Sequence, residues 1–343
     1  MKDTTIESIW GAGKVLSGSL SEYREGMRSV YLHLEHIIRT PESTPPEFSI
    51  GMDALPEDFF AARRNIFSTL FQASYRLLKI NKQRRLLYAK LNLLFRIWVT
   101  SADNLLDNEN KIVVPIRIAP CAHIMPQIIS IMAADRVLKE LLDEAVADNI
   151  ITLEESSLLA TSSLQIILPS AAEEAQEETG IKNRPDPEYV LNTIHRMKTA
   201  ILFHIPFLGP ESIEHSINPE TLNQMKIAYD KIGLGCQLLD DIRDIARDYL
   251  EKKHNYILSQ IFFHNHIAYI NRVEQLQDIE EADNKIYSQF PEVVLPASSL
   301  AQSLLREGLF SLNSLGLNIS SGIVDLMIRS LVNVLDVKEL PDC

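Results

Sequence analysis

The sequence has few glycines and few cysteines, and each scarcity excludes a class of protein. Only 12 glycines occur in 343 residues, with no Asn-Gly or Asp-Gly pair, which argues against the many tight turns of an all-β protein. Its three cysteines, Cys121, Cys236 and Cys343, are too few and too scattered for a disulfide framework or a thiolate metal site. We therefore expect a cytoplasmic protein in a reducing compartment.

Positive charge and long apolar runs are also scarce. The 33 basic residues against 46 acidic ones give a net charge of −13, which argues against binding to nucleic acid or to an anionic membrane. The most apolar window, 118–134, is interrupted by Pro120, His123 and Pro126. We therefore expect no transmembrane segment, and no signal peptide is visible in the first ten residues.

Apolar residues recur instead at helical spacing, and 46% of the chain is hydrophobic, enough for a large buried core. This pattern predicts an all-α protein: one large helical bundle around a central cavity over residues 1–343, with an N-terminal helix and loop in 1–50 and a core of about 55–335. Helices are predicted over roughly 57–80, 81–106, 122–147, 153–178, 187–206, 218–250, 256–285, 295–313 and 318–335. Thr152 and Glu155 form an expected capping box.

The first of two acidic clusters follows the apolar run 91–100. Asp103 and Asp107 are spaced i, i+4, so a helix would place both carboxylates on one face. Hard divalent cations prefer such oxygen ligands. A solvated helix end explains this pair equally well, because two aspartates at this spacing are common.

The second cluster carries more information. Asp240, Asp244 and Asp248 fall at i, i+4 and i+8, and Gln237 lies on the same side of the predicted helix. Four aspartates, with Asp241, occur within nine residues that contain no glutamate, although glutamate favours helices more. A stripe of metal ligands explains this choice better than a wet surface of Asp–Arg pairs, and the oxygen ligands predict Mg²⁺.

On these residues the chain resembles class I isoprenoid synthases of the trans-prenyl-diphosphate type. The segment Asp103-Asn104-Leu-Leu-Asp107 resembles their first aspartate-rich motif, with Asn104 in place of the second aspartate. The segment Gln237-Leu-Leu-Asp240-Asp241-Ile-Arg-Asp244 resembles their second motif. Between the two, Lys198-Thr199 is similar to the family's Lys-Thr helix, which contacts diphosphate. The resemblance spans about residues 85–260.

The resemblance implies a Mg²⁺-dependent site for a small-molecule prenyl diphosphate, with the two acidic helices facing each other across a cavity. The implied metal ligands are Asp103, Asp107, Asp240, Asp241, Asp244 and Asp248, and the implied catalytic residues are Asp103, Asp107, Asp240, Asp244 and Lys198. Implied substrate contacts are Lys198, Thr199, Gln237, Arg243, Trp98, Val99 and Phe203. Gly233 and Gly235 are expected to allow close approach of substrate or a helix break, and a homodimer is expected because relatives in this fold often pair.

Three functions stay open at this point. Chain-elongating relatives carry an arginine pair shortly after the first motif, where this chain has only Lys111 and Arg117. The absence of this arginine pair favours a class I terpene synthase that ionises and cyclises a linear prenyl diphosphate. The alternative is a trans-prenyl-diphosphate synthase or a squalene/phytoene-type condensing enzyme. A third possibility is an inactive helical regulatory subunit, because Asn104 replaces an aspartate of the first motif.

Overall fold

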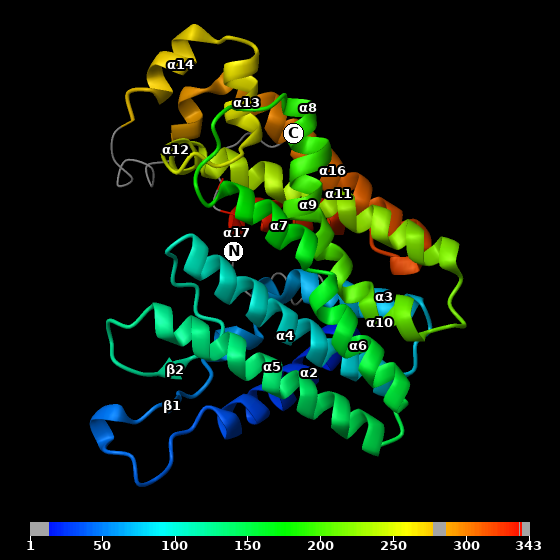
Figure 1. Cartoon of the computed structure of the whole chain (residues 1–343). Helices are drawn as coiled ribbons and strands as arrows, with labels where there is room; N and C mark the ends of the chain where they lie inside the picture. The colour runs from blue at the N-terminus through cyan, green and yellow to red at the C-terminus, as the bar shows by residue number, and fades with distance from the viewer. Residues whose placement is uncertain (1–13, 277–285, 336, 338–343) are drawn as a thin grey trace. The chain divides into compact units, whose positions relative to one another are not determined.

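The computed structural model describes residues 14–276, 286–335 and 337 (Figure 1). The all-α prediction is confirmed over these residues. Their β structure is one antiparallel pair, β1 (Gly51–Met52) and β2 (Ile116–Arg117), in which Gly51 lies opposite Arg117. Among the described helices, none combines the length and the apolar character that crossing a bilayer requires.

Contacts within the chain divide it into two compact units. The first comprises Met1–Ser162 and Leu208–Ile217, and the second comprises Ser163–Phe207 and Asn218–Cys343. The predicted single bundle around one central cavity concerns both units together and stays a prediction. Each unit is described by itself below.

The first unit is built on long helices that pack along α4. Its helices are α2 (Lys14–Ile37), α3 (Ile66–Leu77), α4 (Lys82–Leu106), α5 (Ile124–Ala147), α6 (Leu153–Gln165, which ends in the second unit) and α10 (Leu208–Ile213), with 3-10 turns at Pro46–Phe48, Glu57–Phe60 and Ala62–Asn65. Helix α4 packs against α2, α3 and α5 (Figure 1). Leu87, Leu91 and Leu94 recur along its buried face at helical spacing, which explains why this sequence forms a core helix.

Local capping signals set several helix starts in the first unit. The predicted capping box is confirmed: the Glu155 amide donates to Thr152 Oγ1 at 3.1 Å, and the Thr152 amide donates to Glu155 Oε2 at 2.7 Å. The predicted helix start at residue 57 is wrong, because α3 begins only at Ile66. The Asn65 side-chain amide donates to the carbonyls of Phe59 and Ala61 at 2.8 and 2.9 Å, which stabilises two short turns instead of a helix.

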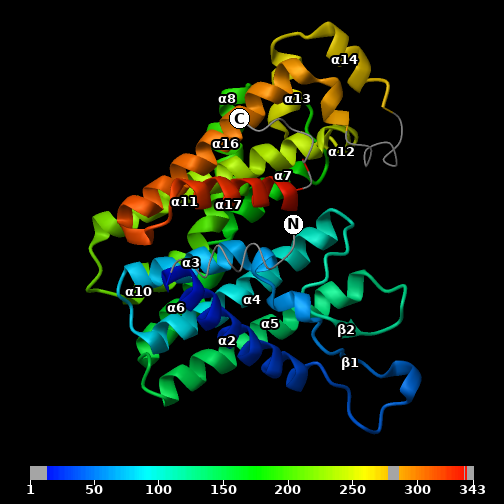
Figure 2. The same cartoon turned by 180° about the vertical axis from the view of Figure 1, so that it is seen from behind.

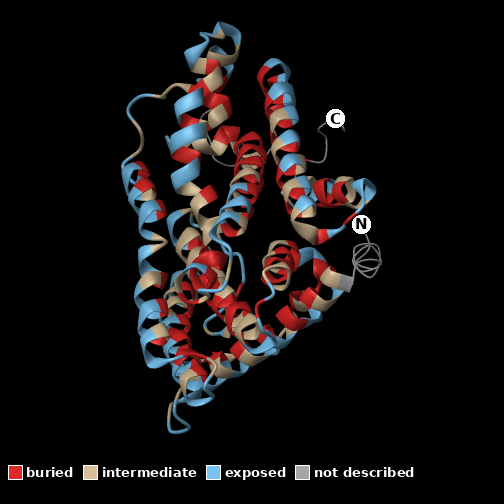
Figure 3. Ribbon diagram, turned by 90° about the vertical axis from the view of Figure 1, so that its right-hand side faces the viewer, coloured by how far each residue is buried: buried red, intermediate tan, exposed pale blue. Residues whose placement is uncertain are grey.

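The second unit is built on α11 and α16, which run side by side, with α17 packed against α16 (Figure 2). Its helices are α7 (Leu168–Glu177), α8 (Pro187–Tyr189), α9 (His195–Lys198), α11 (Pro219–Arg243), α12 (Ile245–Leu250), α13 (Tyr256–Phe263), α14 (Ile267–Val273), α16 (Pro291–Leu312) and α17 (Ser321–Val334), with 3-10 helices at Ala200–Phe207 and Ile286–Gln289 and π-helical turns at Val190–Ile194 and Asn313–Leu317. Buried residues follow one side of the long helices (Figure 3).

The two glycines of α11 serve packing between elements, and α11 runs through both without a break. A Cβ on Gly235 would lie 2.8 Å from the Ala301 carbonyl oxygen of α16. A Cβ on Gly233 would lie 2.9 Å from the Phe203 ring. The predicted helix break at these positions is therefore wrong, because glycine is needed for the close approach of neighbouring helices.

Several long predicted helices are divided in the structure. The range 153–178 becomes α6 and α7, 187–206 becomes four short helical pieces, and 218–250 becomes α11 and α12, separated at Asp244. The range 256–285 becomes α13 and α14, separated at Asn265, which has a φ of 54°. Its last part, 277–285, and residues 1–13 of the predicted N-terminal helix lie outside the described residues.

Candidate functional site

The predicted diphosphate contact Lys198 lies at the end of α9 in the second unit. Its ammonium group lies 2.6 Å from Glu177 Oε2 and 3.2 Å from Glu174 Oε1, both on α7. The Ser170 hydroxyl of α7 donates to the Lys198 carbonyl at 2.9 Å, which ties the two helices together. Sequence reasoning missed these glutamates, since nothing in the local pattern of residues 173–177 distinguishes them from a solvated helix face.

His254 completes an ion cluster around Lys198. Its backbone amide donates to Glu177 at 2.6 Å, and its Nδ1 lies 2.8 Å from Glu177 and 3.2 Å from Glu173. Burial alone would raise the pKa of Glu177, but hydrogen bonds from His254 and the charge of Lys198 outweigh it and lower this pKa to about 2. Burial alone would lower the pKa of His254, but its hydrogen bonds to Glu173 and Glu177 raise it to about 9. His254 is therefore an imidazolium at neutral pH.

This cluster predicts that stability falls at alkaline pH. The pKa of His254 is raised from 6.5 to about 9, so its contribution is complete below pH 6.5 and is lost as pH rises toward 9. We expect the free energy of unfolding to fall over this window by on the order of 3 kcal/mol at most. Denaturant unfolding at pH 6, 7, 8 and 9 measures the change. In H254N the free energy of unfolding should change little with pH over this range. The same pH dependence in H254N and the parent protein would contradict the prediction.

Glu173, Glu177 and His254 also have the donor types of a metal site. One ligand atom from each lies within 4.8 Å of the others. Two carboxylates and an imidazole suit a transition metal better than Mg²⁺. However, the Lys198 ammonium and the His254 imidazolium already supply the positive charge that a cation would bring, so we assign no metal to this trio.

The second acidic motif carries Asp240 and Asp244 near the junction of α11 and α12. Arg243 lies between them: its Nη2 lies 2.5 Å from Asp240 Oδ1, and its Nε donates to Asp244 Oδ1 at 2.7 Å. The helix is interrupted at Asp244, yet the amides of Asp244 and Asp248 still bond the carbonyls four residues before them, at 2.9 and 2.8 Å. The predicted stripe of three aspartates therefore keeps its helical spacing across the break.

Asp248 is the most crowded of these carboxylates. Burial, and after it the negative charges of Asp244 and Asp241, raise the pKa of Asp248 well above its ordinary value. The side-chain amide of Asn255 donates to Asp248 Oδ2 at 2.7 Å and to the Asp241 carbonyl at 2.8 Å. A divalent cation beside Asp248 would offset both the burial and the neighbouring negative charges, and so favour the ionised carboxylate.

Asp241 lies in the core, apart from this stripe. It is 1% exposed, and both of its carboxylate oxygens accept hydrogen bonds. Oδ1 accepts from Gln237 Nε2 at 2.8 Å, and Oδ2 lies 2.7 Å from His195 Nε2 and accepts from the Tyr256 amide at 2.6 Å. Thr199 in turn donates to Gln237 Oε1. Thr199 and Gln237, both predicted substrate contacts, are thus joined directly, while the oxygens of Asp241 are engaged by protein groups.

Phe203 lies in the 3-10 helix that follows Lys198 and Thr199. Its half-exposed ring packs against α11 at Gly233, where any larger residue would collide with it. The second unit therefore brings together Lys198, Thr199, Gln237 and the second acidic motif, with an aromatic side chain beside them.

The first acidic motif lies in the first unit, at the C-terminal end of α4. Asp103 is half-buried, and Asp107 caps the helix, its amide donating to the Asp103 carbonyl at 2.8 Å. Asn104 between them is 3% exposed. Its amide donates to the Lys111 carbonyl at 2.9 Å and to Gln127 Oε1 at 3.1 Å, while its Oδ1 accepts from the Lys111 amide at 3.0 Å. Asn104 thus holds the loop after α4 in place.

These bonds predict that an aspartate is unfavourable at position 104. N104D, which restores the family's pattern, would replace a donor by a carboxylate facing two acceptor oxygens. We expect a loss of about 2–3 kcal/mol in the free energy of unfolding. Denaturant unfolding measures it, with D107N as a control because Asp107 is only half-buried. Equal stability of N104D and the parent chain would contradict the role given to Asn104.

Trp98 and Val99 lie one turn before the first motif on α4. The Trp98 indole donates to the Ile131 carbonyl of α5 at 3.2 Å, and its ring lies 5.5 Å from that of Phe95. Both Trp98 and Val99 are half-buried. Their predicted role at the floor of a substrate pocket stays a prediction.

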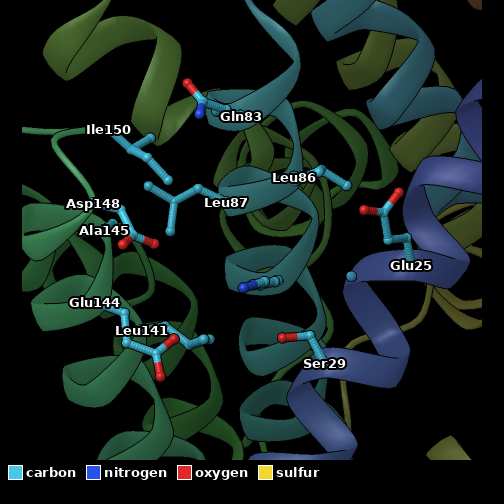
Figure 4. Close-up of a pocket in the computed structure, with 12 residues that line it drawn as sticks. Glu25, Ser29, Gln83, Leu86, Leu87, Leu141, Glu144, Ala145, Asp148 and Ile150 are labelled. Carbon is cyan, nitrogen blue, oxygen red and sulfur yellow. The ribbon is translucent and has the colours of Figure 1, made fainter.

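A half-open pocket of about 240 Å³ lies elsewhere in the first unit, among α2, α4 and α5 (Figure 4). Leu87, Leu141 and Ile150 form its apolar wall, and Glu25 and Glu144 are among its acidic lining groups. None of the predicted site residues lines it, and its carboxylates would repel a diphosphate. We therefore do not assign the pocket to the predicted chemistry.

Comparison with known proteins adds information on the fold. No family model matches the sequence, and no curated protein matches it. The structure is similar to a decaprenyl diphosphate synthase from Rhodobacter capsulatus, with a TM-score of 0.61 and 16% identity, covering 95% of this chain and 100% of that one. It is also similar to a geranylgeranyl pyrophosphate synthase from Lactobacillus brevis, with a TM-score of 0.58 and 15% identity over 95% and 98% of the chains.

A heptaprenyl diphosphate synthase from Staphylococcus aureus is a third similar structure, with a TM-score of 0.55 and 15% identity over 91% of this chain and 97% of that one. At such identities the likeness is one of fold. It agrees with the resemblance seen in the motifs. The chain has the all-α fold of the class I isoprenoid synthases of the trans-prenyl-diphosphate type.

Proposed function

We propose that this protein is a Mg²⁺-dependent prenyltransferase, a trans-prenyl-diphosphate synthase that joins an allylic diphosphate to isopentenyl diphosphate. One observation carries the proposal: the Lys198-Thr199 segment is hydrogen-bonded to Gln237 of the second acidic motif within one compact unit. The sequence alone favoured cyclisation. The named activities of the three similar structures support chain elongation instead.

The residues proposed to hold Mg²⁺ in the second unit are Asp240, Asp244 and Asp248. Their oxygens are hard ligands, and a cation beside them would offset the burial and the neighbouring negative charges that raise the pKa of Asp248. Asp241 is left out of this set, because its two oxygens accept bonds within the core. The role of Asp103 and Asp107 as metal ligands stays a prediction from the first motif. When bound, Mg²⁺ would act as a Lewis acid on the diphosphate oxygens.

The protein's own groups would bind and orient the diphosphate. Lys198 offers a point charge, which requires that it give up at least one of its two glutamate partners. Arg243 offers a planar fork that matches phosphate oxygens, once it releases Asp240 or Asp244 to a cation. The ring of Phe203 presents an apolar surface that excludes water from a developing carbocation.

A class I terpene synthase is the second candidate, and the loop after the first motif favours it. Elongation needs cationic groups for a second diphosphate. Of the two basic residues in this segment, Lys111 pairs with Glu109, and Arg117 lies 3.8 Å from Asp53. Neither residue forms the arginine pair that chain-elongating relatives carry at this place, whereas a cyclase needs no second diphosphate site.

The deciding experiment is incubation with geranyl, farnesyl and geranylgeranyl diphosphates in Mg²⁺, with and without isopentenyl diphosphate. A longer prenyl diphosphate formed only with isopentenyl diphosphate would support the proposal. A hydrocarbon released without it would favour the cyclase. No turnover of any allylic substrate would reject both and favour an inactive regulatory subunit. The predicted homodimer is tested separately by light scattering.

A further inference from the structure

A buried histidine–aspartate pair joins two elements of the second unit. His195 on α9 and Asp241 on α11 are 0% and 1% exposed, and His195 Nε2 lies 2.7 Å from Asp241 Oδ2. A carboxylate only accepts hydrogen bonds, so Nε2 carries the proton. His195 Nδ1 is buried without a hydrogen-bond partner in the described part of the chain, which leaves Nε2 as the ring's functional atom.

The same carboxylate determines the direction of a chain of hydrogen bonds. Because Asp241 Oδ1 must accept, Gln237 turns its NH₂ group toward Asp241 and its Oε1 toward Thr199. The Thr199 hydroxyl therefore donates its proton to Gln237. Thr199 therefore has only acceptor lone pairs left for a further partner, so the group in this chain of bonds that can donate to a diphosphate oxygen is the second N–H of Gln237.

We propose that His195 and Asp241 are positioning residues, which together with Thr199 hold Gln237 in the orientation that offers its second amide N–H beside Lys198. The inference rests on the proposed function, because it concerns the groups offered to the diphosphate. Neither residue touches substrate in this account. His195 acts by limiting the rotation of the Asp241 carboxylate, whose other hydrogen bonds in the described part of the chain come from Gln237 and the Tyr256 amide.

A matched pair of variants tests the role of His195. H195Q places an amide near the position of Nε2 and keeps a donor for Asp241. H195N is one methylene shorter and places its amide near the position of Nδ1, where the histidine has no partner. We expect H195N to raise the KM for the allylic diphosphate about 10–100-fold with a kcat change below about threefold, and H195Q to stay within about threefold of the parent in both.

Inorganic diphosphate serves as a second probe. Its inhibition constant should rise in H195N by the same factor as KM, because both report on binding of the phosphate groups. T199V should raise both constants too, and the H195N/T199V double variant should be no worse than T199V alone, since both changes act on one hydrogen-bond chain. Additive effects would overturn the proposal.

H204L is the matched control. His204 Nε2 lies 2.6 Å from Asp230 Oδ1 in the same unit, so H204L removes a second His–Asp pair that has no link to Gln237. We expect unchanged constants in H204L. An H195N protein that behaves like H204L, or that fails to fold while H195Q folds, assigns the pair to stability and overturns the proposal. Failure of the proposed function is distinct, because the parent protein would then either release a hydrocarbon without isopentenyl diphosphate or turn over no allylic substrate.

Discussion

D240N is expected to lower kcat/KM for the allylic diphosphate about a thousandfold or more while leaving the fold intact. The amide removes one negative charge from the proposed Mg²⁺ ligands with almost no change in volume. The Asp240 side chain is 38% exposed, and Arg243 keeps its two contacts with Asp244, so the free energy of unfolding should change by less than about 1 kcal/mol. Steady-state kinetics and thermal unfolding measure both quantities.

D230N is the matched control for this experiment. Asp230 lies ten residues earlier on the same helix and pairs with His204, outside the second acidic motif. It should retain activity within a small factor. The Mg²⁺ concentration for half-maximal rate should rise in D240N and not in D230N. A D240N enzyme with parental activity would remove Asp240 from the proposed metal ligands.

K198M is expected to affect both activity and stability. The change removes the ammonium that compensates Glu177 and Glu174, and breaking a buried ion pair in this way costs about 3–5 kcal/mol. If Lys198 also binds the diphosphate, kcat/KM should fall by a further hundredfold or more, beyond what partial unfolding explains. Denaturant unfolding and kinetics at a temperature where the variant remains folded separate the two effects.

E174Q tests the same ion cluster from the other side. Glu174 is the more distant of the two glutamates near Lys198, and burial raises its pKa. The glutamine frees Lys198 from one partner and leaves Glu177 in place. We expect E174Q to keep or increase affinity for the diphosphate.

The outcome that would contradict the role of Lys198 in binding is a folded K198M protein with parental kinetics. Lys198 would then have a structural role alone.

The fold class and several local features could be predicted from the sequence, because they depend on residues within about four positions of each other. Apolar spacing predicted the helices, Thr152 and Glu155 predicted a capping box, and the spacing of Asp240, Asp244 and Asp248 predicted a stripe that the structure retains. Helix ends were predicted less well. The start of α3 depends on bonds from the Asn65 side chain, and the break at Asp244 has no local signal such as glycine or proline.

The partners of the site residues were decided by tertiary structure alone. Lys198 lies 21 residues from Glu177, Asn104 lies 23 from Gln127, and Asp241 lies 46 from His195. Helical periodicity predicts which residues lie on the same face of one helix, but it does not predict which distant helix packs against that face. For this reason the sequence placed Asp241 among six equivalent metal ligands, whereas the packing of α9 and α13 against α11 makes it a buried hydrogen-bond acceptor.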